Sequence, residues 1–197
     1  MYRKSITAVI LGAAALFPNV VSAAELVTNG GFETGDFSGW TQTGNTGFSG
    51  VESGVGNTST FSAFFGPVGS TGGITQTLST LVGQLYTFSF AYLADGGTPS
   101  SISAAFNGST IFSLSDPAAN TSYQTFSANV TATSTSTPIA FSFRNDPGFI
   151  NLDSVSVSSA TPAVPEPATW AMMLVGFGAV SFAMRRKQLK TVRLNFA

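Results

Sequence analysis

The stretch at residues 85–93, Leu-Tyr-Thr-Phe-Ser-Phe-Ala-Tyr-Leu, decides the fold class of this chain. Aromatic rings alternate along it with smaller side chains, at Tyr86, Phe88, Phe90 and Tyr92. A repeat of two residues places these rings on one face of an extended strand, because successive side chains of a strand point to opposite faces. The pattern therefore predicts a strand with one face in an apolar core.

Further strands are expected on both sides of this one. Apolar residues predict strands at residues 61–65, 74–78, 123–131 and 139–143. Residues 102–106 and 109–114 flank Asn107-Gly108, a pair that favours a type I′ hairpin turn because both central residues need a positive φ.

The last strand needs an irregularity. Ile150 and Leu152 share one parity, whereas Val155 and Val157 have the other. A β-bulge near Asp153-Ser154 would bring both pairs to the same face. Seven or more short strands, with no helical apolar period, predict an all-β single domain at residues 25–160 with a sandwich architecture.

Charge and composition exclude several function classes. The chain has no Cys and no His, which removes thiolate nucleophiles, Ser-His-Asp triads and nearly all catalytic zinc sites. Residues 25–164 hold eight acids against one cation, Arg144, a net charge of −7. Such a segment cannot neutralise phosphates, so we expect no binding to nucleic acid. Oxygen ligands remain, and they suit Ca²⁺ and the hydroxyl groups of sugars.

The first 24 residues are predicted to be a secretory signal peptide. Arg3 and Lys4 form its charged start, residues 6–17 are apolar, and small residues near Ala23 and Ala24 suit cleavage by signal peptidase. An N-terminal membrane anchor is the alternative, although the apolar run is short for a span.

The C-terminal end carries a second targeting pattern. Residues 161–167 form a proline-rich linker that ends in Pro165, Glu166 and Pro167, and residues 168–184 carry no charge. Seventeen helical residues extend about 25 Å, at the short limit for a span of roughly 30 Å. We predict a transmembrane helix there, with the basic tail at 185–197 in the cytoplasm because cations remain on that side. The topology-setting cations are Arg185, Arg186 and Lys187.

This order of residues resembles the PEP-CTERM sorting signal of Gram-negative bacteria. The matching parts are residues 165–167, 170–173, 176–178 and 185–187. The resemblance implies that an exosortase, a membrane peptidase, recognises Pro-Glu-Pro and removes the helix. The same tail also resembles the segment known as the C-terminal domain of ice-binding proteins, which describes the tail and not an activity. A plain C-terminal membrane anchor is the alternative.

A second resemblance brackets the middle domain. Residues 26–33, Leu-Val-Thr-Asn-Gly-Gly-Phe-Glu, followed by Gly39-Trp40, are similar to the opening of galactose-binding-like jelly rolls. Residues 151–157 are similar to their closing strand. The resemblance implies a jelly-roll-like β-sandwich and a structural Ca²⁺ ion held by Glu33 and Asp153. In the alternative interpretation these two carboxylates are turn or edge residues whose partner is water.

No individual ligand-binding residue can be assigned from the sequence. Rings that could stack on a sugar are present at Trp40, Phe48, Tyr92 and Tyr123, but core packing explains Trp40 and Tyr92 at least as well. Catalysis has little support. Ser49 in Gly-Phe-Ser-Gly-Val has no histidine to activate it. The acid pair Glu33 and Asp36 could serve a glycosidase only at a suitable separation.

We therefore expect a non-catalytic, exported protein of the cell envelope or extracellular matrix, delivered by a signal peptide and processed by exosortase. It would be anchored transiently in the inner membrane and would associate with exopolysaccharide in biofilm. A calcium-stabilised, lectin-like module with a specific glycan site is the alternative, and a glycan hydrolase is a third and weaker one.

Overall fold

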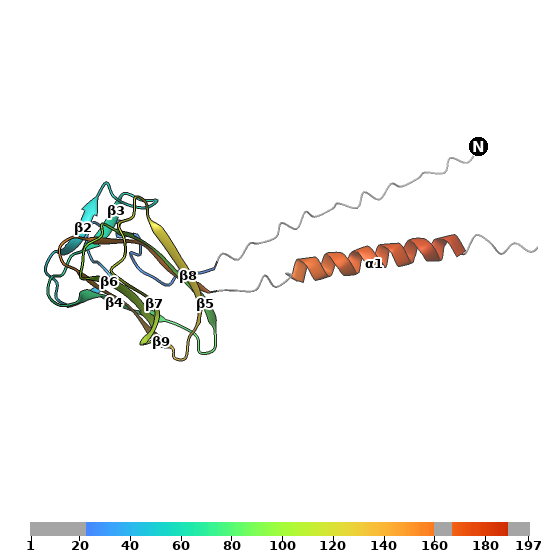
Figure 1. Cartoon of the computed structure of the whole chain (residues 1–197). Coiled ribbons are helices and arrows are strands. Elements are labelled where there is room, and N and C mark those ends of the chain that lie inside the picture. Colours follow the sequence, from blue (N-terminus) through green and yellow to red (C-terminus); the bar gives the residue numbers. More distant parts are fainter. Residues whose placement is uncertain (1–22, 160–166, 189–197) are drawn as a thin grey trace, which may run out of the picture. The chain divides into compact units, whose positions relative to one another are not determined.

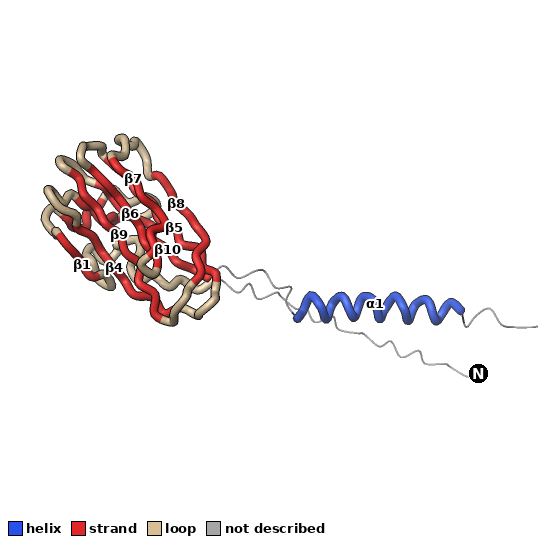
Figure 2. Tube along the Cα trace, turned by 60° about the horizontal axis from the view of Figure 1, so that its bottom comes forward, coloured by secondary structure: helices blue, strands red, loops and turns tan. Residues whose placement is uncertain are grey.

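The computed structural model describes residues 23–159 and 167–188. Ten strands belong to one compact unit and the helix α1 (Pro167–Gln188) belongs to another (Figure 1). The strands are red and the helix blue in Figure 2. The strand bounds are β1 Thr41–Gly44, β2 Ser49–Ser53, β3 Phe61–Phe65, β4 Gly72–Ser79, β5 Leu85–Ala94, β6 Ser100–Phe106, β7 Ser109–Ser115, β8 Gln124–Thr131, β9 Ser136–Asn145 and β10 Ile150–Ser159.

The strands form two five-stranded sheets in which every pair is antiparallel. One sheet has the order β1-β4-β9-β6-β7 and is called the β9 sheet below; the other has the order β2-β3-β10-β5-β8 and is called the β10 sheet. Each sheet is named after its central strand. The predicted all-β sandwich is thus confirmed.

Phenylalanine rings fill the space between the sheets. Phe90 of β5 packs edge-to-face on Phe141 of β9, with ring centroids 5.0 Å apart, and Phe65 of β3 stacks on Phe143 at 4.0 Å. Tyr86, Phe88 and Phe90 are buried as the alternation at residues 85–93 predicts. Offset and edge-to-face pairs are the arrangements that aromatic quadrupoles favour, and they add to the free energy gained by burial.

Two local predictions are confirmed in detail. Asn107 and Gly108 have φ values of +51° and +78° between β6 and β7, as a type I′ turn requires. The register between β10 and β5 shifts between Asp153 and Ser156, where Ser154 has a φ of +54°. This bulge lets the apolar residues on both sides of it point into the core.

The sequence did not indicate β1 and β2. These strands are only four and five residues long and consist of polar residues, glycine and one valine. Each lies at the edge of its sheet and pairs with a single neighbour. Their position depends on strands that come later in the chain, so a local apolar pattern is not needed to form them.

The terminal predictions have mixed outcomes. Residues 1–22, which hold most of the predicted signal peptide, and residues 160–166, which hold Pro165 and Glu166, lie outside the described residues. The predicted helix is present, but it continues through Arg185, Arg186 and Lys187 to Gln188.

Within residues 23–159 and 167–188, no helix combines the length and the apolar character needed to cross a membrane. The predicted transmembrane helix over residues 168–184 is therefore not confirmed.

Candidate functional site

The face of the β10 sheet that points away from the β9 sheet carries an unusual mixture of aromatic and polar residues. Asn151 of β10 lies between Phe64 of β3 and Leu93 of β5. Gly50 of β2 is the partner of Phe64 on its other side. Because side chains alternate along each strand, these residues share the face opposite to the core residues Phe65 and Ile150. We call this side the outer face of the β10 sheet.

Two phenylalanine rings lie over glycines on this face. A Cβ atom at Gly50 would be 2.7 Å from Cζ of Phe64, and one at Gly66 would be 2.8 Å from Cδ1 of Phe149. The two rings meet edge-to-face with centroids 5.5 Å apart, and Phe149 is 41% exposed. The missing Cβ atoms therefore make room for a pair of accessible aromatic rings.

A hydrogen-bonded polar group lies beside the rings. The Asn151 side-chain amide donates from Nδ2 to Oε1 of Glu52 at 2.9 Å and to Oγ of Ser62 at 3.1 Å. Glu52 is exposed and Ser62 is buried. Asn151 therefore fixes one oxygen of the Glu52 carboxylate. No hydrogen bond from the part of the chain that the structure describes reaches the other oxygen, Oε2.

The loop between β2 and β3, residues 54–60, is held on this side by two carboxylates. Asp153 is fully buried, and its Oδ2 accepts hydrogen bonds from Asn57 N at 2.6 Å and Ser59 Oγ at 3.1 Å. Glu33 Oε1 accepts from the backbone N–H groups that end the loop, at Thr60 and Phe61. The Asn57 N–H and the Ser59 hydroxyl therefore compensate much of the cost of burying the Asp153 carboxylate.

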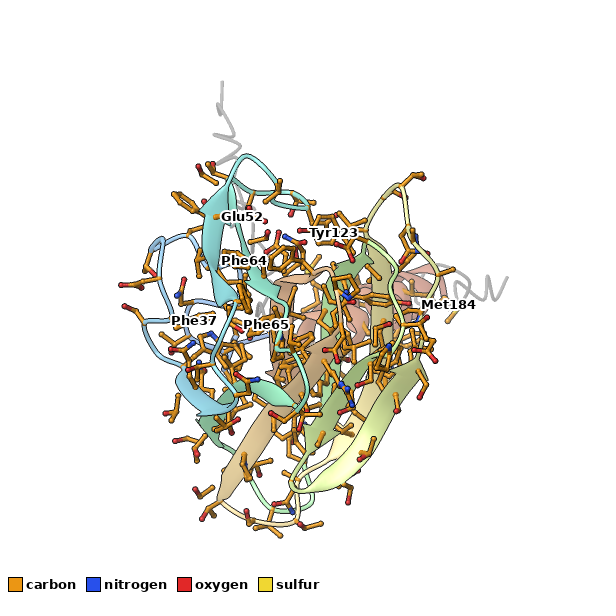
Figure 3. All side chains as sticks on the ribbon, turned by 60° about the vertical axis from the view of Figure 1, so that its left-hand side comes forward. Phe37, Glu52, Phe64, Phe65, Tyr123 and Met184 are labelled. Carbon is orange, nitrogen blue, oxygen red and sulfur yellow. The ribbon has the colours of Figure 1, made fainter. Side chains whose placement is uncertain are left out.

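Tyr123, which directly precedes the edge strand β8, reaches this loop. Its hydroxyl donates to the carbonyl oxygen of Val55 at 2.7 Å. Burial raises the pKa of Tyr123, a hydrogen bond with the Ser62 side chain opposes that effect, and the carboxylates of Asp153 and Glu52 raise the pKa further. The phenol therefore lies within electrostatic range of both acids, and Figure 3 shows Glu52, Phe64 and Tyr123 in the same part of the sandwich.

The outer face of the β10 sheet has no cation. Arg144, the lone cation of the sandwich in the sequence, has the parity of the outer face of the β9 sheet and contacts Asp146 at 2.7 Å. The Arg144 hydrogen bond lowers the pKa of Asp146. Arg144 is therefore paired on the other sheet and is not a partner of Glu52 or Asp153.

The two carboxylates predicted to bind Ca²⁺ fit such an ion only in part. A Cβ at Gly31 would be 3.7 Å from Asp153 Oδ1 and 3.8 Å from Glu33 Cγ, so both acids flank this glycine. However, the carbonyl of Asn29 already accepts hydrogen bonds from Phe32 N and Trp40 Nε1. Within the described residues no cluster of three or more His, Cys, Asp or Glu could hold a metal. Backbone carbonyls and water would have to complete the six to eight oxygens that Ca²⁺ takes.

The aromatic residues singled out from the sequence have different positions. Trp40 is buried in the core, as the interpretation of core packing predicts, and Tyr92 packs on Phe90 and Phe112. Phe48 is 67% exposed, in a loop position with a φ of +54°. Of the four, Tyr123 makes the contacts described above with the outer face of the β10 sheet.

Four residues of this face were not predicted as site residues from the sequence: Phe64, Phe149, Glu52 and Asn151. A usable signal existed for Phe64. It neighbours the buried Phe65 in a strand, and two adjacent strand residues cannot both point into the core. Glu52 lies on a strand that the sequence did not indicate, and Asn151 comes close to it only through the pairing of β10 with β3 and of β3 with β2.

Comparison with known families identifies the C-terminal segment. Residues 163–187 match the PEP-CTERM protein-sorting motif. The chain therefore carries the sorting signal that its sequence resembles, and it is an exported protein. The matched residues are a small part of the chain, so the motif identifies the sorting route and not the activity of the sandwich. No curated protein matches the sequence.

Solved structures with the same fold are mainly carbohydrate-binding modules. A CBM61 module in complex with β-1,4-galactotriose superimposes with a TM-score of 0.56 at 17% identity, covering 68% of this chain and 98% of that one. The CBM22-1 xylan-binding domain of Paenibacillus barcinonensis Xyn10C gives 0.51 at 16%, covering 72% and 98%. At these identities the similarity shows the fold alone.

The same fold also occurs in enzymes. A cyclase from Fischerella sp. TAU superimposes with a TM-score of 0.54 at 14% identity, covering 72% of this chain and all of that one. The sandwich is therefore like a carbohydrate-binding module in its fold, and its activity has to be argued from its own residues.

We expect the stability of the Tyr123→Phe variant to depend less on alkaline pH than that of the wild type. The raised pKa of Tyr123 means that its protonated form stabilises the fold below pH 10, and that this contribution is lost as the pH rises through the folded-state pKa. The melting temperature of the wild type should therefore fall more steeply above about pH 10 than that of the variant. At neutral pH the lost hydrogen bond should cost about 1 kcal/mol.

Thermal melts between pH 7 and pH 12 test this expectation. Tyr92→Phe is the matched control, since the Tyr92 hydroxyl makes no hydrogen bond among the described residues. Parallel alkaline melting curves for the wild type and Tyr123→Phe would contradict the proposed environment of Tyr123.

Proposed function

We propose that this protein is a non-catalytic carbohydrate-binding protein of the cell envelope or extracellular matrix, and that it binds a glycan on the outer face of the β10 sheet. The observation that carries the proposal is the pair of rings Phe64 and Phe149, laid over glycines beside the hydrogen-bonded Glu52 and Asn151. Sugar rings have an apolar face that stacks on aromatic side chains, and hydroxyl groups that bind amides and carboxylates.

The similarity of fold supports this proposal from another direction. The CBM61 structure contains a galactotriose, and the structure of Clostridium thermocellum Xyn10B CBM22-1–GH10 modules contains xylohexaose. The latter superimposes with a TM-score of 0.55 at 16% identity, covering 73% of this chain and 30% of that one. The galactotriose belongs to the CBM61 protein, but it indicates that a sandwich of this shape can present a glycan-binding surface.

The roles of the acids favour binding over hydrolysis. Glu33 and Asp153 accept hydrogen bonds from loop 54–60, and Asp36 accepts from Thr34 and Ser38 within its own turn. A glycosidase needs two carboxyl groups that face one another across a substrate. Glu33 and Asp36, the pair considered from the sequence, are engaged in separate structural contacts, so hydrolysis is the weaker hypothesis.

The match to the sorting motif supports a location outside the cytoplasm for the proposed binding activity. Processing by exosortase at Pro165-Glu166-Pro167 would release the sandwich to the envelope or beyond. An exopolysaccharide of the producing cell is then the nearest abundant glycan. We propose that the protein associates with this polymer in biofilm.

Removing the aromatic surface should weaken glycan binding with little effect on folding. In Gly50→Ala the new Cβ would displace the tip of the Phe64 ring, a flexible end of a side chain, and Phe64→Ala would remove the ring. We expect each change to lower the affinity of the full chain for host exopolysaccharide roughly tenfold, equivalent to about 1.4 kcal/mol of lost stacking.

Retention on immobilised exopolysaccharide and thermal melts would measure the two effects. Leu85→Ala is the control, because Leu85 is an exposed apolar residue eight positions from Leu93 along β5, about 27 Å away. If both site variants are retained like the wild type and also melt like it, the outer face of the β10 sheet is not the glycan-binding surface.

Loss of the sorting motif should leave the protein unprocessed. In the native host, Pro165→Ala combined with Glu166→Ala should yield a chain that still carries residues 168–197, because the sequence that exosortase is expected to recognise is absent. Intact mass of the accumulated protein measures this, with Pro162→Ala as the control for general effects on residues 161–167. Equal processing of the two variants would contradict a role for Pro-Glu-Pro.

We also propose a structural Ca²⁺ ion between Glu33 and Asp153, as a stabiliser and not as part of the binding surface. Millimolar Ca²⁺ should raise the melting temperature of the metal-stripped full chain, because an ion that binds only the folded state stabilises it by mass action. Glu33→Gln should abolish the rise and Glu52→Gln should not. A melting temperature that does not respond to Ca²⁺ would mean that the folded protein binds no stabilising Ca²⁺ ion.

A further inference from the structure

We infer that the glycan bound at this face carries amino groups, as in a partly deacetylated amino-sugar polymer. The inference rests on the proposed function and names its ligand class. It begins from Glu52, whose carboxylate is exposed and fixed through Oε1 by Asn151 Nδ2 at 2.9 Å. The second oxygen of that carboxylate has no donor in the described residues, so a ligand that brings a donor can bind it.

The Phe64 ring lies on the same face of the sheet as Glu52. Glu52 and Gly50 are two residues apart on β2, so they share the outer face, and the Phe64 ring covers Gly50. Neighbours of this kind on one sheet face have Cβ atoms within about 5–8 Å of each other. A carboxylate beside aromatic rings suits an ammonium group, which forms a charge-assisted hydrogen bond with the acid and a cation–π contact with a ring.

A second, buried acid makes this preference stronger. Asp153 accepts hydrogen bonds from the loop and has no cationic partner in the described residues. Its charge and the charge of Glu52 both raise the pKa of Tyr123. Both carboxylates therefore act on the space around the Tyr123 hydroxyl. A cation near that point gains from both charges, whereas an anion is repelled by both.

Residues 23–159 contain no unpaired cation that would make this surface favour an anion over a cation. Their lone cation, Arg144, is paired with Asp146 and has the parity of the other sheet's outer face. Polyuronates and sulfated glycans would have to approach a domain of net charge −7 whose one cation in residues 23–159, Arg144, is already paired with Asp146. Charge complementarity therefore favours amino-bearing glycans over anionic polymers.

Three oligosaccharides of equal length test the inference by calorimetric titration of the full chain. They are a glucosamine hexamer, its fully N-acetylated form and a hexuronate. The glucosamine hexamer should bind about ten to a hundred times more tightly than the acetylated form, the range expected for a charge-assisted hydrogen bond. The hexuronate should not bind, and raised salt should weaken the binding of the glucosamine hexamer.

Two variants distinguish binding at a specific site from general attraction between opposite charges. Glu52→Gln should remove most of the preference for the glucosamine hexamer and leave binding of the acetylated form almost unchanged. Asp36→Asn removes the same charge from an exposed turn in which the carboxylate accepts hydrogen bonds from Thr34 and Ser38, and it should preserve the preference. Equal losses in the two variants would mean non-specific attraction and would overturn the inference.

The remaining outcomes distinguish this inference from the function on which it rests. If the acetylated hexamer binds as tightly as the glucosamine hexamer, and Phe64→Ala weakens both, the amino-group inference is wrong and the glycan site stands. Tighter binding of the hexuronate would also overturn it. If neither the three hexamers nor host exopolysaccharide binds, the proposed function itself fails.

Discussion

The bulge between Asp153 and Ser156 is the constraint on which the rest of the candidate site depends. Strand β10 contacts both β3 and β5, so its apolar residues before and after the bulge must point into the same core. A regular strand would turn one of these groups to the outside, because a shift of one residue exchanges the two faces. The bulge avoids this loss and leaves Asp153 as a buried acid next to the extra residue.

A buried carboxylate needs donors, and loop 54–60 provides them. The bonds from Asn57 and Ser59 fold this loop over the sheet, and the same loop presents the Val55 carbonyl to Tyr123. The irregularity in β10 is therefore linked, through one carboxylate and one loop, to the phenol that comes from the opposite edge of the sheet. The bulge that keeps the apolar residues of β10 in the core therefore also shapes the outer face of the β10 sheet.

The parts of this arrangement that the sequence revealed are those set by local pattern. Alternation identified β5, the parity change at Leu152 and Val155 located the bulge, and Asn107-Gly108 specified the turn. Phe64 and Phe149 come together over glycines from different strands, and Glu52 meets Asn151 across 99 residues of chain. Contacts of that kind depend on the order of strands in the sheet, which no local period of the sequence encodes.

The distribution of charge connects the site with the sorting signal. Seven of the eight cations lie in the first four residues or after residue 184, in the segments that signal peptidase and exosortase are proposed to remove. The basic residues of the chain are thus concentrated where membrane targeting uses them. The remaining sandwich would be acidic throughout, so copies of it would repel one another. A polymer that carries amino groups could hold many such copies together, because each bound copy offsets part of the charge that keeps free copies apart.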